Sequence, residues 1–354
     1  MTVDQPPRAT HVAESTNDPA ADHTIALARL IGEGRLSREI GVTRHGRRDG
    51  VGMQAMTTIA AMAVARFAGC RYFHSPFTSM EHAQGPAKEW AQRWEQFLNF
   101  GDGESPVPKH AELVQLSEIV ENASAYADRP VIIAEKGFNL PPAVGVPIRE
   151  TLRSELRKRY WRSSKSAVPS HRGPANGLTV AIHVRRGDVN PITPRGRYVR
   201  DELVLRRIEQ VKKALAPFGR RTKLNLYSEG RPEDFGAFAQ AGCHLHISED
   251  AIETFHNMVT ADVLVDACSG FSYLAGFLSE GIVVDHRRRA PRYKNWIGRR
   301  KNGSVSTRRL RRLLIRRMSW YERCIYQIRR FTGLRSRNLD LVGPSASTDA
   351  GSQP

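Results

Sequence analysis

The sequence predicts an α/β protein with two Rossmann-like domains that face each other across a cleft, followed by a basic helical extension. Three observations lead to this fold class. Short β-branched apolar runs alternate with longer helical patterns through the middle of the chain, which is typical of a parallel sheet covered by helices. A weaker version of the same alternation precedes it. The length of 354 residues also suits two domains.

The first domain is expected at 40–150, after a disordered leader at 1–25. The leader has scattered acidic residues and no apolar core, so it does not have the pattern of a secretory signal. Glycines at Gly50 and Gly52 form a turn before an Ala- and Met-rich helix. The predicted elements are a helix over Met53–Phe67, a strand over Cys70–His74, a helix carrying Trp90, Trp94, Phe97 and Leu98, and a strand over Val131–Ala134.

The second domain is expected at 175–290, after an Arg-, Pro- and Ser-rich connection at about 140–176. Leu178–Val184 is an apolar β-branched run, which suits a strand buried on both faces. Prolines open or end several of the helices that follow. The later elements are a helix over Asp201–Ala216, a strand over Leu224–Tyr227, a helix opening at Pro232, a strand over His244–Ile247, a helix over Ala251–Thr260, a strand over Val263–Ala267, a helix over Phe271–Leu278 and a strand over Ile282–Asp285.

The basic charge is concentrated near the C-terminus. The chain has 54 Lys and Arg against 36 Asp and Glu, a formal net charge of +18, and residues 287–337 hold 19 of the basic residues with one acid. The rest of the chain is therefore electrically balanced. We expect a basic amphipathic helical tail at 300–335 and a disordered end at 338–354. The apolar stripe of the helix suits either packing on the folded body or contact with an anionic membrane.

Composition excludes several classes of protein. The longest apolar stretch, Ala55–Ala65, is well short of a membrane-spanning helix. The 4 cysteines are far apart, without the spacing of a zinc site or a disulfide framework. We therefore expect a cytoplasmic protein, at most peripheral at the cytoplasmic face of a membrane, with no bound metal.

The sharpest motif is His183-Val-Arg-Arg-Gly-Asp188, directly after the predicted strand over Leu178–Val184. In an open α/β sheet the carboxyl ends of the strands face the ligand crevice, so Arg185 and Arg186 would lie at the mouth of a cleft. Guanidinium groups bind phosphate oxygens in a bidentate manner. The alternative is a surface arginine pair neutralised by Asp188.

Two further strand ends carry polar side chains. Asp266-Ala-Cys-Ser-Gly-Phe-Ser-Tyr273 turns from a strand into a helix, where hydroxyl groups and free backbone N–H groups either hold an anion or simply cap the helix. Tyr227-Ser-Glu-Gly230 ends another strand with a hydroxyl and a carboxylate that suit a sugar or a base. Together the strand ends predict one polar site along one edge of the sheet.

In this order, the motifs resemble those of the fucosyltransferase superfamily that uses GDP-fucose, including α1,2-, α1,6- and protein O-fucosyltransferases. Gly50-Val-Gly-Met-Gln54 is similar to its Gly-x-Gly-x-Gln loop, His183–Asp188 to its HxRRGD signature, and Ser269-Gly-Phe-Ser272 to its Ser-rich motif. The resemblance covers about Gly41–Arg287. It implies a GT-B fold and inverting, metal-independent transfer of L-fucose from GDP-fucose, without a separate cofactor, to a glycan or lipid-linked glycan acceptor.

The resemblance also implies roles for individual residues. Catalytic roles fall on Arg185, Arg186 and Asp188, and donor-binding roles on Gly50, Gly52, Gln54, His183, Ser228, Glu229, Asp266, Ser269, Phe271 and Ser272. The chain has no DxD motif, so fixed cations would have to stabilise the departing diphosphate in place of a metal. Related α1,6-enzymes carry a Glu base after the arginines, which is missing here. The candidate bases are Asp49, Glu81, His82 and Asp188.

Other functions compete with this reading. Gly50-Val-Gly-Met-Gln-Ala55 also fits a dinucleotide fingerprint, but no hydrophobic strand precedes it and no acid follows at the distance needed for the ribose. Another nucleotide sugar would suit the same motifs. A non-enzymatic protein that binds nucleic acid or a membrane would explain the tail alone. No zinc spacing, RNP sequence or helix-turn-helix accompanies the tail, so we expect no specific nucleic-acid partner.

Overall fold

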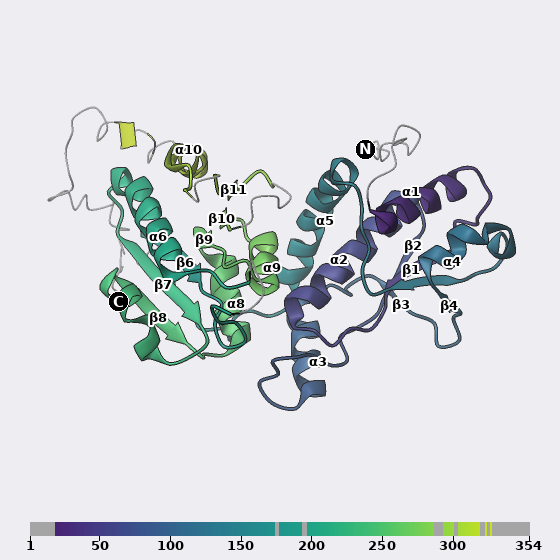
Figure 1. Ribbon diagram of the computed structural model, residues 1–354, viewed down its shortest axis with the longest axis horizontal. Helices are drawn as coiled ribbons and strands as arrows, with labels where there is room; N and C mark the ends of the chain where they lie inside the picture. The colour runs from purple at the N-terminus through teal and green to yellow at the C-terminus, as the bar shows by residue number, and fades with distance from the viewer. Residues whose placement is uncertain are drawn as a thin grey trace, which may run out of the picture.

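The computed structural model describes residues 18–173, 177–192, 197–286, 293–300, 304–318, 323 and 326–327. It contains two parallel β-sheets flanked by helices, one in each half of the chain (Figure 1). The strand order is β3-β2-β1-β5-β4 in the first sheet and β11-β10-β9-β6-β7-β8 in the second. The predicted α/β class with two parallel sheets is confirmed.

The N-terminal domain has a sheet of five short strands with helices packed against it. Its strands are β1 (Gly41–Arg44), β2 (Arg71–His74), β3 (Ser105–Pro106), β4 (Leu113–Val114) and β5 (Ile132–Glu135). Its helices are α1 (Pro19–Gly32), α2 (Val51–Ala68), α3 (Ala87–Leu98), α4 (Leu116–Glu121) and α5 (Pro142–Arg162), with the 3₁₀ turn η2 (Ala123–Tyr126). The Ala-rich sequence of α2 allows β1, α1, α5 and α9 to pack closely around it. Of the described helices, α2 alone is long and apolar enough to cross a membrane, and 72% of it is buried in the fold.

Helix α1 corrects the predicted disordered leader. Asp18 caps the helix by accepting the backbone N–H of Ala20 at 3.1 Å, and Pro19 occupies the first turn. Leu27 and Ile31 are buried where α1 packs on α2 and α4. Disorder is therefore wrong for 19–25, because the apolar side chains at helical spacing find a core. The rest of the predicted leader, 1–17, lies outside the described residues.

Helix α5 corrects the predicted connection between the domains. Residues 142–162 form one continuous helix that packs on α2 and also on α9 of the second domain. Its many Arg and Pro residues hid the buried stripe of Leu152, Leu156 and Tyr160. Pro142 opens the helix, a position where proline is well tolerated, whereas Pro147 lies within the second turn and removes one backbone hydrogen bond of the helix. The first part of the predicted connection is therefore a helix that passes the expected boundary at 150.

The C-terminal domain follows the predicted alternation closely. Its strands are β6 (Leu178–His183), β7 (Thr222–Ser228), β8 (Cys243–Ile247), β9 (Val263–Val265), β10 (Ile282–Asp285) and β11 (Trp296–Gly298). Its helices are α6 (Asp201–Leu215), α7 (Gly236–Gln240), α8 (Ala251–Thr260), α9 (Gly270–Leu278) and α10 (Thr307–Arg317), with the 3₁₀ turns η3 (Ala216–Phe218) and η4 (Pro232–Phe235). Helices α8 and α9 lie toward the N-terminal domain, whereas α6 and α10 lie on the other side of the sheet (Figure 1).

Helix α10 packs its apolar stripe on the C-terminal domain. Leu310 and Leu314 are buried in the core that also contains α6 and β10. Arg311 donates to the backbone carbonyl oxygens of Ala214 (3.3 Å) and Lys213 (2.7 Å) at the C-terminal end of α6, a favourable place for a cation. Helix α10 ends at Arg317, and its C-cap Met318 has an extended backbone at φ −75° and ψ 146°. The predicted helical tail at 300–335 is therefore interrupted at 318, and Arg323, Tyr326 and Gln327 are helical again among the described residues. The predicted disordered end at 338–354 lies outside the described residues.

Candidate functional site

The three polar motifs of the second domain meet at one edge of its sheet. Strands β9, β6 and β7 are neighbours and run parallel. His183 ends β6, Ser228 ends β7, and Asp266 directly follows β9. The Ser228 hydroxyl donates to the carbonyl oxygen of Val184 at 2.7 Å, which ties the ends of β6 and β7 together. The carboxyl edge of the second sheet is therefore the candidate site.

Arg185 and Asp188 form an ion pair at this edge. Arg185 Nε donates to Asp188 Oδ1 at 3.0 Å, and the second guanidinium nitrogen pairs with the other carboxylate oxygen. This pair raises the pKa of Arg185 and lowers the pKa of Asp188. Between them, Gly187 has φ +79°, and a Cβ there would lie 2.3 Å from Glu229 Oε2. Glycine therefore allows Glu229 of the next strand end to approach the motif.

Arg186 has a different set of partners from Arg185. Its guanidinium donates to the carbonyl oxygens of Arg185 (2.7 Å) and Val199 (3.0 Å) and pairs with the carboxylate of Asp201 at the start of α6. It also lies over the ring of Tyr198, 4.3 Å from the centroid. The structure thus separates the two signature arginines: Arg185 lies beside Glu229, and Arg186 anchors the segment before α6.

His183 and Asp266 each leave one buried polar atom without a partner. Burial lowers the pKa of His183 to about 4, so its imidazole is neutral at neutral pH. Its Nδ1 has no hydrogen-bond partner. One oxygen of Asp266 accepts the Ser272 hydroxyl, and Oδ2 is buried without a partner. Unpartnered buried polar atoms are rare in proteins and mark positions that a ligand or water completes.

The sequence interpretation missed Arg207 on α6. This side chain is 1% exposed, and none of its three guanidinium nitrogens has a hydrogen-bond partner. Burial, reinforced by nearby Arg299, lowers its pKa, whereas Asp266 and Asp285 act in the opposite direction. The available signal was the position of Arg207 between Val204 and Val211 on the apolar face of a helix, where an unpaired cation is costly.

The N-terminal ends of α9 and α2 meet at the boundary between the domains. Ser269 caps α9 by accepting the backbone N–H of Phe271 at 3.2 Å. Cys268, just before the cap, has φ +59°, a conformation that non-glycine residues adopt mainly at constrained and functional sites. A Cβ on Gly52 would lie 2.2 Å from the carbonyl carbon of Gly270. Both helices therefore present the positive ends of their dipoles to the same region.

Gln54, in the first turn of α2, fixes the start of this helix through hydrogen bonds within the N-terminal domain. It is fully buried, and its amide nitrogen donates to the carbonyl oxygens of Asp49 (2.7 Å) and Ser79 (2.8 Å). Its side-chain oxygen accepts from Arg44 Nη1 at 3.3 Å. The amide is thus fully used within the N-terminal domain. Gly50 is the N-cap of α2, and a Cβ there would lie 3.7 Å from the ring of His82.

An aromatic cluster joins the two domains beneath the site. The Phe271 ring lies 5.8 Å from His183, 5.4 Å from Phe255 and 6.0 Å from Trp94 of α3, measured between ring centroids. At the rim, Gln84 donates to the carbonyl oxygen of Glu249 (3.1 Å) and accepts the N–H of Ala251 (2.9 Å). The domains are therefore in direct contact at the site, through packing below and hydrogen bonds at the rim.

Gly52→Ala is expected to lower the free energy of unfolding by about 1–3 kcal/mol or more, because the added methyl would collide with backbone atoms that cannot turn away. Gly32→Ala is the matched control, since a Cβ at Gly32 meets nothing within 4 Å. Urea unfolding of both variants measures the difference. Equal stability of the two variants would show that α2 and α9 are not held at this distance.

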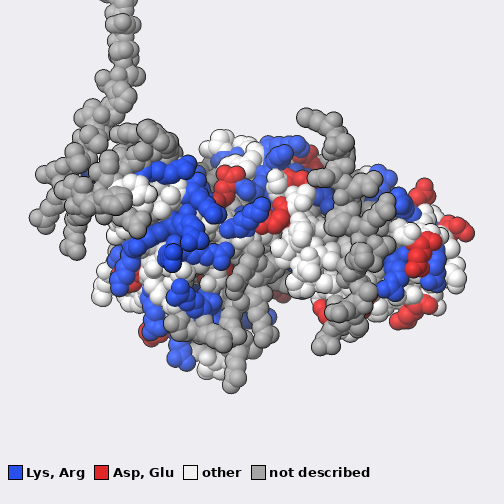
Figure 2. Space-filling view, turned by 90° about the horizontal axis from the view of Figure 1, so that it is seen from above, with Lys and Arg blue, Asp and Glu red and all other residues white. Residues whose placement is uncertain are grey.

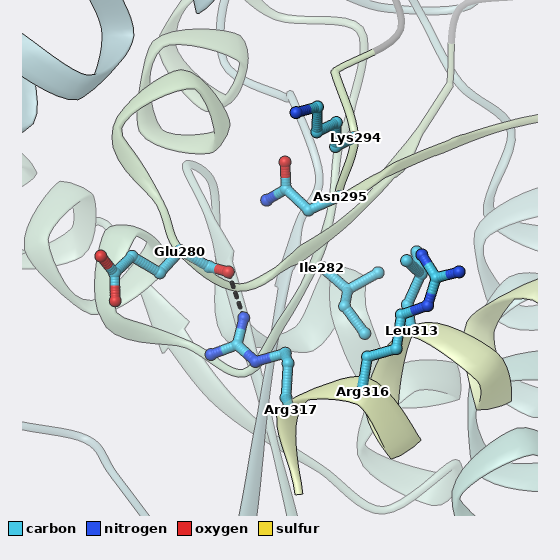
Figure 3. Close-up of a pocket in the computed structure, with 7 residues that line it drawn as sticks. All are labelled: Glu280, Ile282, Lys294, Asn295, Leu313, Arg316 and Arg317. Atoms are coloured by element: carbon cyan, nitrogen blue, oxygen red, sulfur yellow. Dashed lines mark hydrogen bonds between the residues drawn. The ribbon is translucent and has the colours of Figure 1, made fainter.

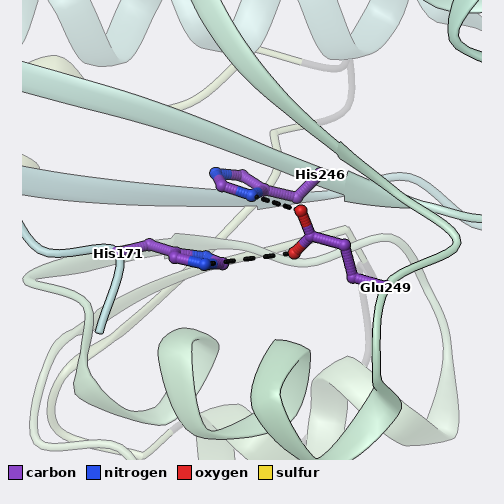
Figure 4. A group of neighbouring side chains, drawn as sticks. All are labelled: His171, His246 and Glu249. Atoms are coloured by element: carbon purple, nitrogen blue, oxygen red, sulfur yellow. Dashed lines mark hydrogen bonds and ion pairs between the residues drawn. The ribbon is translucent and has the colours of Figure 1, made fainter. Parts of the chain in front are cut away.

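One group of side chains in the described residues has the composition of a metal site. His171, His246 and Glu249 place ligand atoms within 4.8 Å of one another (Figure 4). The two rings are stacked, with centroids 3.9 Å apart and planes 13° from parallel, so their in-plane lone pairs do not converge on one ion. All four ring nitrogens also have partners, which are Tyr227, Glu253, Glu249 and Asn225. The geometry favours a hydrogen-bonded network over metal coordination.

The four candidate bases differ in their partners. Asp49 pairs with Arg47, which lowers the pKa of its carboxyl, and Asp188 pairs with Arg185. His82 and Glu81 form no side-chain hydrogen bond or ion pair with a described residue. His82 is exposed, has φ +57° and lies close enough to Asp188 to lower the pKa of that carboxyl. Glu81 and His82 are therefore both without a side-chain partner among the described residues. His82 is the one of these two that interacts with Asp188 of the site.

Comparisons with known proteins give few matches. Neither a protein-family model nor a curated protein sequence matches the chain. POFUT1 in complex with GDP is similar at 12% identity over 70% of this chain and 96% of that chain, with a TM-score of 0.37. POFUT1 in complex with GDP-fucose gives 12% identity, 72% and 74% coverage, and a TM-score of 0.25. At TM-scores this low, these similarities assign neither a fold nor a function to the chain.

Proposed function

We propose that the protein is a glycosyltransferase that takes its sugar from a nucleoside diphosphate sugar, with GDP-L-fucose as the donor. The observation that carries the proposal is the position of Arg185 at the carboxyl edge of the second sheet, close to Cys268 just before α9, whose N-terminal end meets that of α2. Departure of a nucleoside diphosphate creates negative charge that the enzyme must stabilise. A fixed guanidinium and two helix N-termini supply that stabilisation without a metal.

The roles of the residues follow from their places in the fold. Arg185, Ser269 and the first N–H groups of α9 would bind the diphosphate. His183, Asp266 and Glu229 offer a neutral imidazole and carboxylate oxygens for the hydroxyl and N–H groups of the nucleoside and sugar. Ser228, Ser272 and Phe271 fix these groups in position. Arg186, Gly50, Gly52 and Gln54 would act indirectly, by holding the loop of the motif and the start of α2.

We propose a glycan or lipid-linked glycan as the acceptor and His82 as the group that takes the proton from its hydroxyl. Inverting transfer needs a base on the acceptor side, and His82 belongs to the domain opposite the donor residues. Replacing His82 with Gln should lower kcat about 100-fold or more, because positioned proton transfer contributes about 10²–10⁴-fold. The donor KM should remain within about twofold. Glu81→Gln is the adjacent control, and an equal loss in both variants would point to a disturbed loop instead.

Transfer is expected to continue in excess EDTA, because the positive charge at the site belongs to the chain itself. The measurement compares initial transfer rates with EDTA, with Mg²⁺ and with Mn²⁺. A rate that falls to background in EDTA and returns with either metal would contradict the proposed site.

The proposal as a whole is tested with a panel of nucleotide sugars in a transfer assay. GDP-fucose should be consumed and its nucleoside diphosphate released, whereas the UDP sugars should react at least 10-fold more slowly (about 1.4 kcal/mol per factor of ten). Preference for a UDP sugar would leave a glycosyltransferase with a different donor. No turnover of any nucleotide sugar would contradict the proposed class of enzyme.

A further inference from the structure

The strongest surface charge of the described chain lies on α10 and the segment before it. Residues 293–300 and 304–318 contain nine Lys and Arg and no Asp or Glu. Five of these are exposed on or beside one helix, and we call them the α10 surface: Arg308, Arg309, Arg312, Arg316 and Arg317. Seen from above, Lys and Arg side chains gather over this part of the C-terminal domain (Figure 2).

The α10 surface is held outward by the packing of the helix. Leu310, Leu314 and Met318 are buried in the domain core, so the helix cannot roll to hide its arginines. Arg308, Arg312 and Arg316 are spaced by four residues and therefore share one face. None of the five arginines forms an ion pair with a described carboxylate. The surface is thus a fixed row of cations without internal neutralisation.

A pocket of about 470 Å³ lies beside the α10 surface (Figure 3). Its lining residues are Glu280, Ile282, Lys294, Asn295, Leu313, Arg316 and Arg317. The Glu280 carboxylate points away from the other labelled side chains and pairs with Arg157, while the Glu280 carbonyl oxygen accepts from Arg317. The pocket therefore keeps a net positive charge from Lys294, Arg316 and Arg317, beside an apolar wall.

The pocket is separate from the proposed donor site. Glu280 and Ile282 stand at the start of β10, and Lys294 and Asn295 directly precede β11. These positions lie at the amino edge of the second sheet, whereas Arg185 and Ser269 lie beyond its carboxyl edge. A ligand of this pocket can therefore be tested independently of the donor.

We propose that the α10 surface and its pocket bind the phosphate headgroups of an anionic lipid membrane. The exposed arginines match a layer of negative charge, and the pocket offers cations for one phosphate together with Leu313 and Ile282 for apolar lipid atoms. A membrane fits better than nucleic acid, because the phosphates of a duplex make no use of the apolar wall formed by Leu313 and Ile282, and no described residue of α10 is aromatic and able to stack on an unpaired base. This proposal stands whether or not the proposed enzymatic function is correct.

Vesicle sedimentation of the full chain tests the proposal. Vesicles of phosphatidylcholine mixed with phosphatidylglycerol should bind the protein, and vesicles of phosphatidylcholine alone should not. Arg312→Gln combined with Arg316→Gln should weaken binding about 30-fold, at about fivefold for each basic residue near the surface. Arg38→Gln combined with Lys109→Gln removes the same charge from exposed positions of the N-terminal domain and should leave binding unchanged. Both double variants should unfold at the wild-type urea midpoint.

Two further arms separate the sources of phosphate. Inorganic phosphate at the concentration of the accessible lipid should displace little protein from the vesicles, because a free ion offers neither a layer of neighbouring charges nor an apolar surface. Full displacement by phosphate, or equal loss of vesicle binding in the two double variants, would overturn the proposal. A third result would also overturn the proposal: the protein binds random duplex DNA more tightly than anionic vesicles at the same salt concentration, and the α10 double variant no longer binds that DNA.

Discussion

Replacing Arg185 with alanine should lower kcat for sugar transfer about 100- to 1,000-fold, the usual cost of removing a fixed donor that stabilises charge in the transition state. Arg185 is the signature arginine beside Glu229, and its charge also interacts with Cys268 just before α9. The fold should survive, because the ion pair with Asp188 is partly exposed and such pairs contribute about 0–1 kcal/mol.

Arg231→Ala is the matched control for Arg185. It removes the same charge from the next strand end, where Arg231 pairs with Asp234 and is 78% exposed. Steady-state kinetics with saturating acceptor would compare the two variants. Wild-type kcat and KM in Arg185→Ala, or an equal loss in both variants, would remove Arg185 from the site. A raised KM at wild-type kcat would assign Arg185 to binding that the ground state and the transition state share.

Arg153→Met should lower the free energy of unfolding by about 3–5 kcal/mol, because a hydrogen bond to a charged group contributes about 1.5–3 kcal/mol and the change removes three of them. Arg153 of α5 is buried and donates to the carbonyl oxygens of Phe277 (2.5 Å) and Ser279 (2.6 Å) and to Asn295 Oδ1 (2.9 Å). Methionine fills much of the space but leaves all three oxygens without this donor. Because α5 begins in the first domain, the change should loosen the join between the domains.

Arg162→Met on the same helix is the control for this stability change. Arg162 is exposed and pairs with Asp102, so its removal should cost no more than about 1 kcal/mol. Urea unfolding followed by tryptophan fluorescence would report both variants. A loss in Arg153→Met no larger than that in Arg162→Met would mean that α5 contributes little to the contact with α9.

The alternation of strands and helices in the second domain could be predicted because both faces of its sheet are covered. Strand β6 is buried at every position, so its residues read as one apolar run. Helix α8 begins after Asp250, whose carboxylate accepts the N–H groups of Ile252 (2.8 Å) and Glu253 (3.0 Å), and the predicted bounds were correct. Strands β3 and β4 have two residues each, too few for any periodicity.

The position of the site could be predicted, but the direction of its side chains could not. Strand ends follow from the apolar runs, which placed His183, Ser228 and Asp266 at one edge. Whether Arg185 or Arg186 turns toward Glu229 depends on the left-handed turn at Gly187 and on the partners that Arg186 finds before α6. These contacts join segments distant in the sequence.

The same limit applies to the contacts between the domains. Gly52 looked like part of a ligand loop, yet its missing side chain is what allows α9 to approach. Arg207 was not singled out in the sequence, although it is buried and its guanidinium has no hydrogen-bond partner among the described residues. A local sequence pattern does not predict which residues of another domain, or of a sheet, contact a given side chain. Such contacts became visible only once the two sheets were assembled.

Calorimetric titration of GDP tests the central claim most directly, because the claim places a nucleoside diphosphate at the carboxyl edge of the second sheet. The wild-type protein should bind GDP in EDTA, and it should bind guanosine at least 10-fold more weakly, since the cations and helix ends act on the phosphates. Arg185→Ala and Ser269→Ala should each weaken GDP binding, whereas Arg312→Gln with Arg316→Gln should leave it unchanged. Absence of GDP binding, or GDP affinity that depends on Arg312 and Arg316 and not on Arg185, would contradict the account.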